Sequence, residues 1–130
     1  MCSSDLKKYS IKADCRAYLD NIEKVYEWAD IVVARAGALT VSEFSAAGIS
    51  SILVPFPFAV DNHQFYNAQY LSDKKAARLI IQDEITPELL SGLIQDMTRD
   101  QCLKMSKAAM ENRAVKPEEV IYQECERLIK

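Results

Sequence analysis

The chain has 130 residues, of which 49% are hydrophobic and 27% are charged, and its formal net charge is -3. This length gives room for one domain with a modest core. The scattered, slightly acidic charge argues against a nucleic-acid surface, which normally carries a basic stripe. No apolar run approaches the roughly 20 residues that span a bilayer, and the start has no apolar signal-peptide core. We therefore expect a cytosolic protein that binds no nucleic acid.

The cysteines and the single histidine show no metal-binding pattern. None of the four cysteines forms a CxxC pair, and His63 is the only histidine. Structural zinc sites need four closely placed ligands of these types. Spacing alone leaves disulfides open, although reduced thiols suit a cytosolic protein better. We expect neither a metal ion nor a cofactor.

The first half of the chain alternates short apolar runs with amphipathic stretches, which predicts a repeating β–α architecture. Residues 11–17 alternate charged and small apolar residues, which fits a strand near a sheet edge with one solvent-exposed face. Asp20 or Asn21 can cap a helix that continues to about Trp28. The β-branched run at 31–34 is typical of a buried parallel strand.

A turn at 36–37 then leads into a helix over about 40–47, which Gly48 ends. Residues 51–54 form the next predicted strand, and Pro55 and Pro57 end it and force an extended loop. A helix over about 63–71 and a strand over 79–81 follow. Beyond residue 83 the pattern is helical, and Pro117 suits the first turn of a terminal helix.

These elements predict an α/β fold: a partial Rossmann-like parallel sheet of about four strands, flanked by helices and followed by a helical C-terminus. In a doubly wound sheet of order 3-2-1-4-5-6, the chain would supply strands 3, 4, 5 and 6. The strand at 11–17 would then lose its normal neighbour and expose unpaired backbone groups. We expect it to detach, to pair against the remaining sheet, or to pair with another chain.

Residues 29–43, with the sequence ADIVVARAGALTVSE, form the most informative segment: a buried strand, a tight turn and a helix opening. Free backbone N–H groups at Ala38, Leu39 and Thr40 can face an anion or a sugar oxygen, assisted by the helix dipole. Glu43 lies one turn further on, where a carboxylate can accept two hydrogen bonds from a ribose diol. Many such junctions bind nothing, and Thr40 with Glu43 also has capping-box spacing, so this pattern leaves both a binding and a structural role open.

This segment closely resembles the donor-site signature of the MurG family, inverting N-acetylglucosaminyltransferases of the two-domain GT-B architecture. The family pattern is approximately A-D-V-V-V-x-R-[SA]-G-A-L-T-V-S-E. Residues 54–68, VPFPFAVDNHQFYNA, are similar to the family's V-P-[FY]-…-D-x-[HQ]-Q-x-x-N-A segment. The two motifs have the family's order and separation. The resemblance implies that residues 1–130 are an incomplete C-terminal domain for the UDP-sugar donor, without the N-terminal acceptor domain and the first strands of the C-terminal domain.

The resemblance implies roles for the residues of the first motif. Glu43 would hold the ribose hydroxyls of UDP-N-acetylglucosamine. Ala38, Leu39 and Thr40 would line the sugar and the pyrophosphate. Arg35 occupies the matching arginine position, and its alternative role is to orient the loop through local hydrogen bonds.

Four more donor-site positions follow from the resemblance. His63 and Gln64 match a polar pair that meets the N-acetylglucosamine hydroxyls. Leu19 matches the residue whose main chain reads the uracil edge, and Tyr18 takes the neighbouring aromatic position. His63 is rejected as a general base because the family also accepts glutamine there, which cannot take a proton at neutral pH.

Structural roles are preferred for the other polar and aromatic residues of the second motif. Asp61 is expected to be a helix N-cap, with a ligand contact as the alternative, and Asn67 a packing or loop-anchoring residue. The cluster Phe56-Pro57-Phe58 is expected to be an ordinary buried loop, with contact to a partner domain as the alternative.

The family's reaction transfers N-acetylglucosamine from UDP-N-acetylglucosamine to lipid I, forming lipid II for peptidoglycan and cell wall growth. The resemblance assigns no catalytic residue to this chain, because lipid I binding and membrane contact belong to the N-terminal domain. The parent enzyme would be cytoplasmic and peripheral on the inner face of the cell membrane. We expect the isolated chain to be inactive and to bind the nucleotide sugar weakly. Two alternatives stay open: a donor-half subunit of another UDP-sugar transferase, and a non-catalytic nucleotide-binding or interaction module.

Overall fold

The computed structural model describes residues 13–113 and 117–129. Three parallel strands form one sheet in the order β1-β2-β3, namely β1 (Val32–Ala34), β2 (Ser51–Leu53) and β3 (Ala77–Leu79). Two short 3-10 turns, η1 (Val60–Asn62) and η2 (Gln82–Glu84), lie in the connections after β2 and β3. The helices are α2 (Ile22–Trp28), α3 (Ala38–Ala47), α4 (His63–Asp73), α5 (Pro87–Asp96), α6 (Arg99–Glu111) and α7 (Pro117–Ile129).

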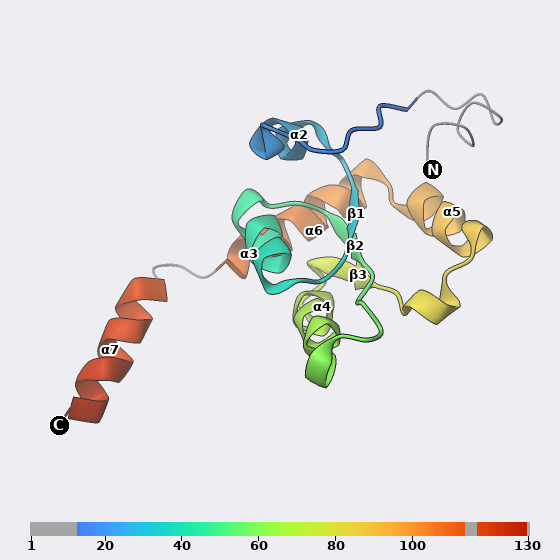
Figure 1. Ribbon diagram of the computed structural model, residues 1–130. Coiled ribbons are helices and arrows are strands. Elements are labelled where there is room, and N and C mark those ends of the chain that lie inside the picture. The colour runs from blue at the N-terminus through green and yellow to red at the C-terminus, as the bar shows by residue number, and fades with distance from the viewer. Residues whose placement is uncertain (1–12, 114–116, 130) are drawn as a thin grey trace.

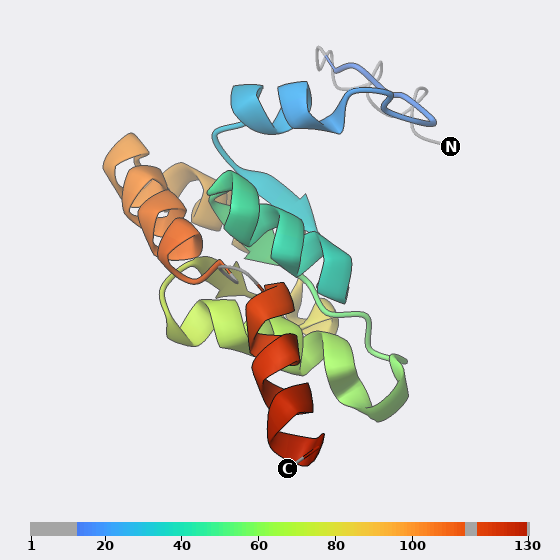
Figure 2. The ribbon, with the colours of Figure 1, turned by 90° about the vertical axis from the view of Figure 1, so that its left-hand side faces the viewer.

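Helices cover both faces of the sheet (Figures 1 and 2). Successive side chains of β2 point to opposite faces, and both Ile52 and Leu53 are fully buried. Leu53 packs in one core with Phe44 of α3 and Leu71 of α4. Ile52 packs in a second core with Met105 of α6 and with partly buried residues of α5. This two-sided burial around parallel strands confirms the predicted α/β fold.

The sheet has three strands rather than about four, because residues 13–17 form no strand. Asp14 and Arg16 are exposed and pair with each other at 2.6 Å. Their alternation with small residues has the period of a strand, but a strand persists only where a neighbour accepts and donates its ladder hydrogen bonds. Within the described residues this segment is therefore detached, the first of the three expected outcomes. Residues 11 and 12 lie outside the described part.

β3 begins two residues earlier than predicted, at 77–79 instead of 79–81. Its register with β2 decides this, because Ala77 lies opposite Ser51 and Leu79 opposite Leu53. The apolar run at 79–81 reflects the partial or full burial of these side chains, whereas the strand is defined by backbone pairing with β2. Beyond the strand, the Ile80 N–H still donates to the Leu53 carbonyl at 3.0 Å.

Local signals set the ends of several helices. Gly48 ends α3 in the left-handed conformation, with φ 67°, as predicted. Asn21 stands at the N-cap of α2, but its side chain makes no capping hydrogen bond. In contrast, the Thr86 hydroxyl accepts from the Leu89 N–H at the start of α5, and Thr98 with Gln101 forms a capping box at the start of α6.

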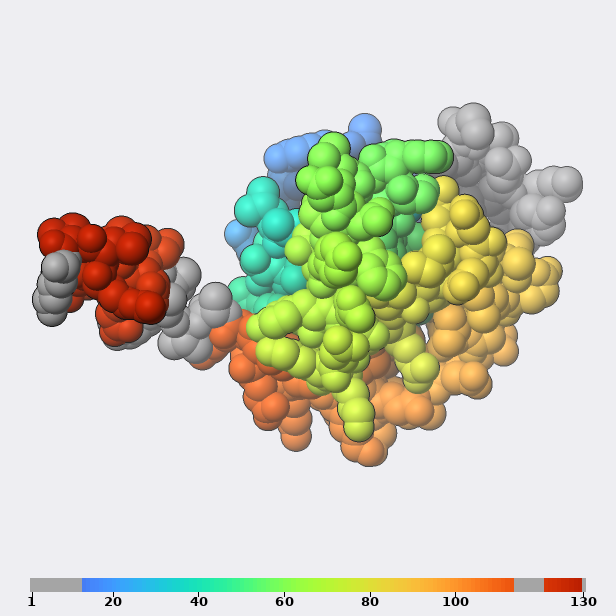
Figure 3. Space-filling model, turned by 90° about the horizontal axis from the view of Figure 1, so that it is seen from below, coloured from blue at the N-terminus to red at the C-terminus, as the bar shows by residue number. Residues whose placement is uncertain are grey.

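The terminal helix α7 extends away from the rest of the described chain (Figures 1 and 3). Its apolar residues Ile121, Leu128 and Ile129 are exposed. These apolar side chains are thus uncovered here. None of the helices that the structure describes has the length and apolarity to traverse a bilayer.

Candidate functional site at the carboxyl edge of the sheet

Arg35, the first residue after β1, connects the ends of all three strands. Its guanidinium donates to the carbonyls of Val54 and Pro55 after β2, at 3.3 and 3.2 Å. It also donates to Oε1 of Gln82, in η2 after β3, at 2.5 Å. The planar fork of arginine suits several acceptors at once. These contacts agree with the alternative role for Arg35, orienting the loops through local hydrogen bonds.

The amino end of α3 is open at this same edge. Gly37 is the N-cap without a side-chain hydrogen bond, and the first helical bond runs from Val41 N–H to the Gly37 carbonyl. The amides of Ala38, Leu39 and Thr40 precede that bond and have no intrahelical acceptor. Thr40 is the third helical residue rather than the cap, so a capping box with Glu43 is excluded. The result is a positive helix end facing outward.

Gly37 is not required by the backbone conformation of this turn. Its φ of -63° and ψ of 150° are open to any residue, and an added Cβ would meet only Thr40 Oγ1, at 3.6 Å. An alanine would therefore fit the fold. The missing side chain instead leaves the approach to the helix-end amides clear, which is what close contact with a ligand demands.

Glu43 lies on the exposed face of α3. Its Oε2 accepts a hydrogen bond from the Tyr26 hydroxyl of α2 at 3.0 Å. A carboxylate turned into the hydrophobic interior would have ended the ligand-binding interpretation. Glu43 instead faces solvent about one helical turn from the open amides, so a ligand can reach both.

Burial and the neighbouring Glu43 carboxylate raise the pKa of Tyr26 to about 12 from 10.0, burial being the larger cause. The unfolded chain ionises this phenol first, so its contribution to stability is complete below pH 10 and disappears as the pH rises through 12. The stability difference between the wild type and Tyr26→Phe should therefore shrink over this range. Denaturant unfolding of both proteins at several pH values measures it. A stability difference that stays constant with pH would contradict the raised pKa of Tyr26.

The start of α4 anchors the loops that follow β1 and β2. Gln64 Oε1 accepts from the Phe56 N–H at 3.0 Å. Asn67 Nδ2 donates to the Ala36 carbonyl at 3.1 Å, which confirms the loop-anchoring role predicted for Asn67. His63 is exposed, and its Nδ1 lies 2.7 Å from the Val60 carbonyl. Because that carbonyl can only accept, Nδ1 carries the proton and Nε2 is left for another partner.

Two expectations for this loop were wrong. Asp61 is not the N-cap of α4, because that position falls on Asn62, which makes no side-chain capping bond. Both residues have left-handed φ, 52° and 53°, so the chain turns sharply before the helix instead of entering it from an extended cap. The Phe56–Phe58 segment is not buried either, with Phe56 43% and Phe58 82% exposed. The two prolines keep it extended over the surface.

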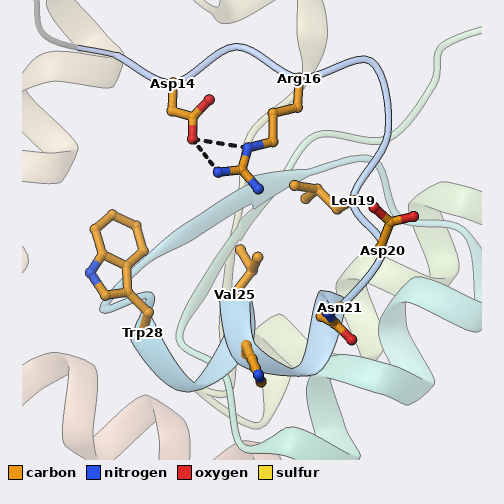
Figure 4. Close-up of a pocket in the computed structure, with 8 residues that line it drawn as sticks. Asp14, Arg16, Leu19, Asp20, Asn21, Val25 and Trp28 are labelled. Carbon is orange, nitrogen blue, oxygen red and sulfur yellow. Dashed lines mark hydrogen bonds and ion pairs between the residues drawn. The ribbon is translucent and has the colours of Figure 1, made fainter.

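The predicted uracil positions, Leu19 and Tyr18, lie in the segment before α2. Leu19 lines an open hollow of about 670 Å³, shown in Figure 4, whose other lining residues are Asp14, Arg16, Asp20, Asn21, Lys24, Val25 and Trp28. Neither Glu43 nor the open end of α3 lines this hollow. Tyr18 is 79% exposed and does not line it either. The hollow that Leu19 lines therefore does not include the residues of the junction.

Sequence reasoning missed two residues that shape this edge. Tyr26 fits the apolar spacing of its helix, and that spacing gives no sign of a hydroxyl partner on α3. Gln82 lies in η2, outside both motifs, and its bond to Arg35 follows only from the sheet order. The one signal available for Tyr26 was a tyrosine on the apolar side of a helix, since a tyrosine hydroxyl beside a core usually finds a hydrogen-bond partner.

The parallel sheet covered by helices and the open helix end at its carboxyl edge define a class: an α/β domain of the nucleotide-binding type of architecture. The chain matches the glycosyltransferase family 28 C-terminal domain over residues 1–123 and belongs to that family. This assignment confirms the resemblance carried by the two motifs.

Similar proteins agree with this family. The UDP-N-acetylglucosamine–N-acetylmuramyl-(pentapeptide) pyrophosphoryl-undecaprenol N-acetylglucosamine transferase of Dechloromonas aromatica is 42% identical over 92% of this chain and 34% of its own length. The enzyme of that name from Nitrosospira multiformis is 48% identical over 78% of the chain and 28% of its own length. The crystal structure of MurG from Acinetobacter baumannii superposes with a TM-score of 0.82 at 32% identity, over 90% of this chain and 36% of that one. The chain thus spans about a third of the length of these relatives.

Proposed function

We propose that this chain is the donor-binding part of an inverting glycosyltransferase that moves N-acetylglucosamine from UDP-N-acetylglucosamine to lipid I, forming lipid II in peptidoglycan synthesis. The observation that carries the proposal is the open amino end of α3 with the exposed Glu43 one turn away. The names of the similar transferases supply the substrates. Acceptor binding and contact with the inner face of the cell membrane belong, in this proposal, to a domain outside these 130 residues.

The proposed contacts follow from the position of each group. The amides of Ala38, Leu39 and Thr40 face the diphosphate, where a helix amino end favours negative charge. Glu43 accepts the ribose hydroxyls. Arg35 supports them by holding the three strand ends together.

The other proposed contacts lie on α4 and before α2. His63 Nε2 and the free amide nitrogen of Gln64 meet the sugar hydroxyls, because their other polar atoms are already bonded to the protein. Leu19 and Tyr18 flank the uracil. Leu19 lines a hollow beside α2 that Glu43 does not line, and this last part of the proposal rests on the sequence resemblance.

The proposed reaction is a single displacement. The acceptor hydroxyl oxygen forms a bond to the anomeric carbon as the bond from that carbon to the diphosphate oxygen breaks, so the configuration inverts. The hydroxyl proton passes to a base that this chain does not supply, and UDP leaves with the electron pair. Preorganised helix-end amides stabilise the negative charge that grows on the diphosphate.

Isothermal titration calorimetry of the chain with UDP-N-acetylglucosamine, UDP-glucose and UDP tests the proposal. We expect weak binding that favours UDP-N-acetylglucosamine. Glu43→Ala should lower its affinity at least about tenfold, because a charged hydrogen-bond acceptor for two hydroxyls is lost. The matched control is Glu111→Gln, an exposed carboxylate at the far end of α6, which should leave the affinity unchanged.

Other outcomes point to the alternatives. Preference for a different sugar would indicate a donor half of another UDP-sugar transferase. Indifference to all three compounds would indicate a non-catalytic module and contradict the donor site. Transfer of the sugar by the purified chain alone would refute the view that the acceptor half lies elsewhere.

A further inference from the structure

Tyr26 and Glu43 join two helices that are distant in the sequence. The Tyr26 hydroxyl, on α2, donates to Oε2 of Glu43, on α3, over 3.0 Å and 17 residues of sequence. Figure 2 shows α2 lying beside the strand and helix that carry the junction. Tyr26 therefore donates to the carboxylate that, in the proposed function, accepts the ribose hydroxyls.

Tyr26 is held by the core rather than by solvent-side contacts. Its ring meets the ring of Phe44 edge-on, with centroids 5.6 Å apart and planes at 88°. Phe44 is only 1% exposed and belongs to the core between the sheet, α3 and α4. A ring fixed in this way aims its hydroxyl in a constant direction, whereas an exposed glutamate on a helix is otherwise free to change rotamer.

The bond leaves Glu43 able to accept from a ligand. A carboxylate offers about four lone-pair positions on its two oxygens, and Tyr26 uses one of them on Oε2. Oε1 and the second position on Oε2 stay available for two neighbouring hydroxyls. Fixing the carboxylate before the ligand arrives lowers the ordering cost of binding.

We propose that Tyr26 is a positioning residue whose hydroxyl orients the Glu43 carboxylate toward a ribose diol, so that the site selects ribonucleotides over 2′-deoxyribonucleotides. The inference rests on the proposed function and deepens it. Tyr26 acts through Glu43 and does not touch the ligand.

The test compares the affinities of UDP and 2′-deoxy-UDP for the wild type, Tyr26→Phe, Glu43→Gln and the double variant. Phenylalanine keeps the ring against Phe44 and removes only the hydroxyl. The preference for UDP should fall roughly threefold to tenfold in Tyr26→Phe, the range of one hydrogen bond. In the Glu43→Gln background, Tyr26→Phe should have no further effect on the preference, since its action passes through that carboxylate.

Tyr122→Phe is the matched control. Its hydroxyl bonds Glu126 Oε1 at 2.9 Å within α7, the same pair of groups outside the site, and its loss should change neither affinity. A second measurement needs no variant: UDP should shift the NMR signals of the Tyr26 ring more than 2′-deoxy-UDP does. Equal shifts with both ligands would overturn the inference, whatever the stability of Tyr26→Phe.

The two proposals fail differently. If the wild type binds neither ligand, or Glu43→Gln changes nothing, the donor-site proposal fails. If Glu43→Gln removes the preference for UDP while Tyr26→Phe keeps it, or weakens both ligands equally, only the positioning role is refuted.

Discussion

Gly48→Ala should lower the free energy of unfolding by about 2 to 3 kcal/mol. Gly48 has φ 67° and ψ 49°, and this left-handed conformation costs a residue with a Cβ about 1 to 2 kcal/mol. The new Cβ would also lie 2.5 Å from Met110 Cγ and 2.8 Å from its Sδ. Met110 is 45% exposed and can move, so the clash adds about 1 kcal/mol, the lower end for overpacking. Denaturant unfolding measures the loss.

The chain offers a matched control in Gly92, inside α5. An added Cβ there meets nothing within 4 Å, so Gly92→Ala should raise stability by up to about 1 kcal/mol through helix propensity alone. The double variant Gly48→Ala with Met110→Ala separates the two causes, because it relieves the clash and keeps the backbone strain. If Gly48→Ala and Gly92→Ala had the same effect, the account of Gly48 would be refuted.

Arg35→Ala should cost about 2 kcal/mol, because hydrogen bonds to charged groups contribute about 1.5 to 3 kcal/mol when buried and less when exposed. The change leaves the carbonyls of Val54 and Pro55, two buried residues, without their guanidinium donor. It also frees η2 from β1 by removing the bond to Gln82. Chemical denaturation gives the stability change, and amide exchange after β2 and β3 should accelerate.

Arg35→Lys should recover only part of the lost stability, because a single ammonium cannot reach acceptors on two loops as the planar guanidinium does. Arg78→Ala, an exposed arginine in β3, should stay within about 0.5 kcal/mol of the wild type. If Arg35→Ala left the free energy of unfolding unchanged yet removed UDP binding, Arg35 would contact the ligand instead of holding the loops after the strands together.

The sequence was most informative where the signal is local. Three local signals coincide with element bounds in the structure. The β-branched run before Arg35 contains β1, α3 ends just before Gly48, and α7 begins at Pro117. The ligand-binding interpretation of the junction motif required an exposed Glu43 beside an open helix end, and Glu43 is exposed there. Asn67 was predicted as a packing or loop-anchoring residue, and its side chain donates to the Ala36 carbonyl.

The failures concern pairing and surroundings. Residues 13–17 have the period of a strand but no neighbour, and β3 starts at Ala77 because its register with β2 requires it. Phe56 and Phe58 are as apolar as core residues, yet the turn through Asp61 and Asn62 carries their loop over the surface. Hydrophobicity states a preference for burial and does not state whether the fold provides cover.

The amino-acid sequence alone determined the class of this protein, the α/β order of its elements, and a helix opening with an acid one turn inside it. Only the tertiary structure decided that Tyr26 holds that acid, that Arg35 binds three strand ends, and that Gln64 supports the loop after β2. The reason is physical. Local backbone preferences depend on residues within about one helical turn, whereas these bonds span from 8 to 47 residues and exist only once the strands lie side by side.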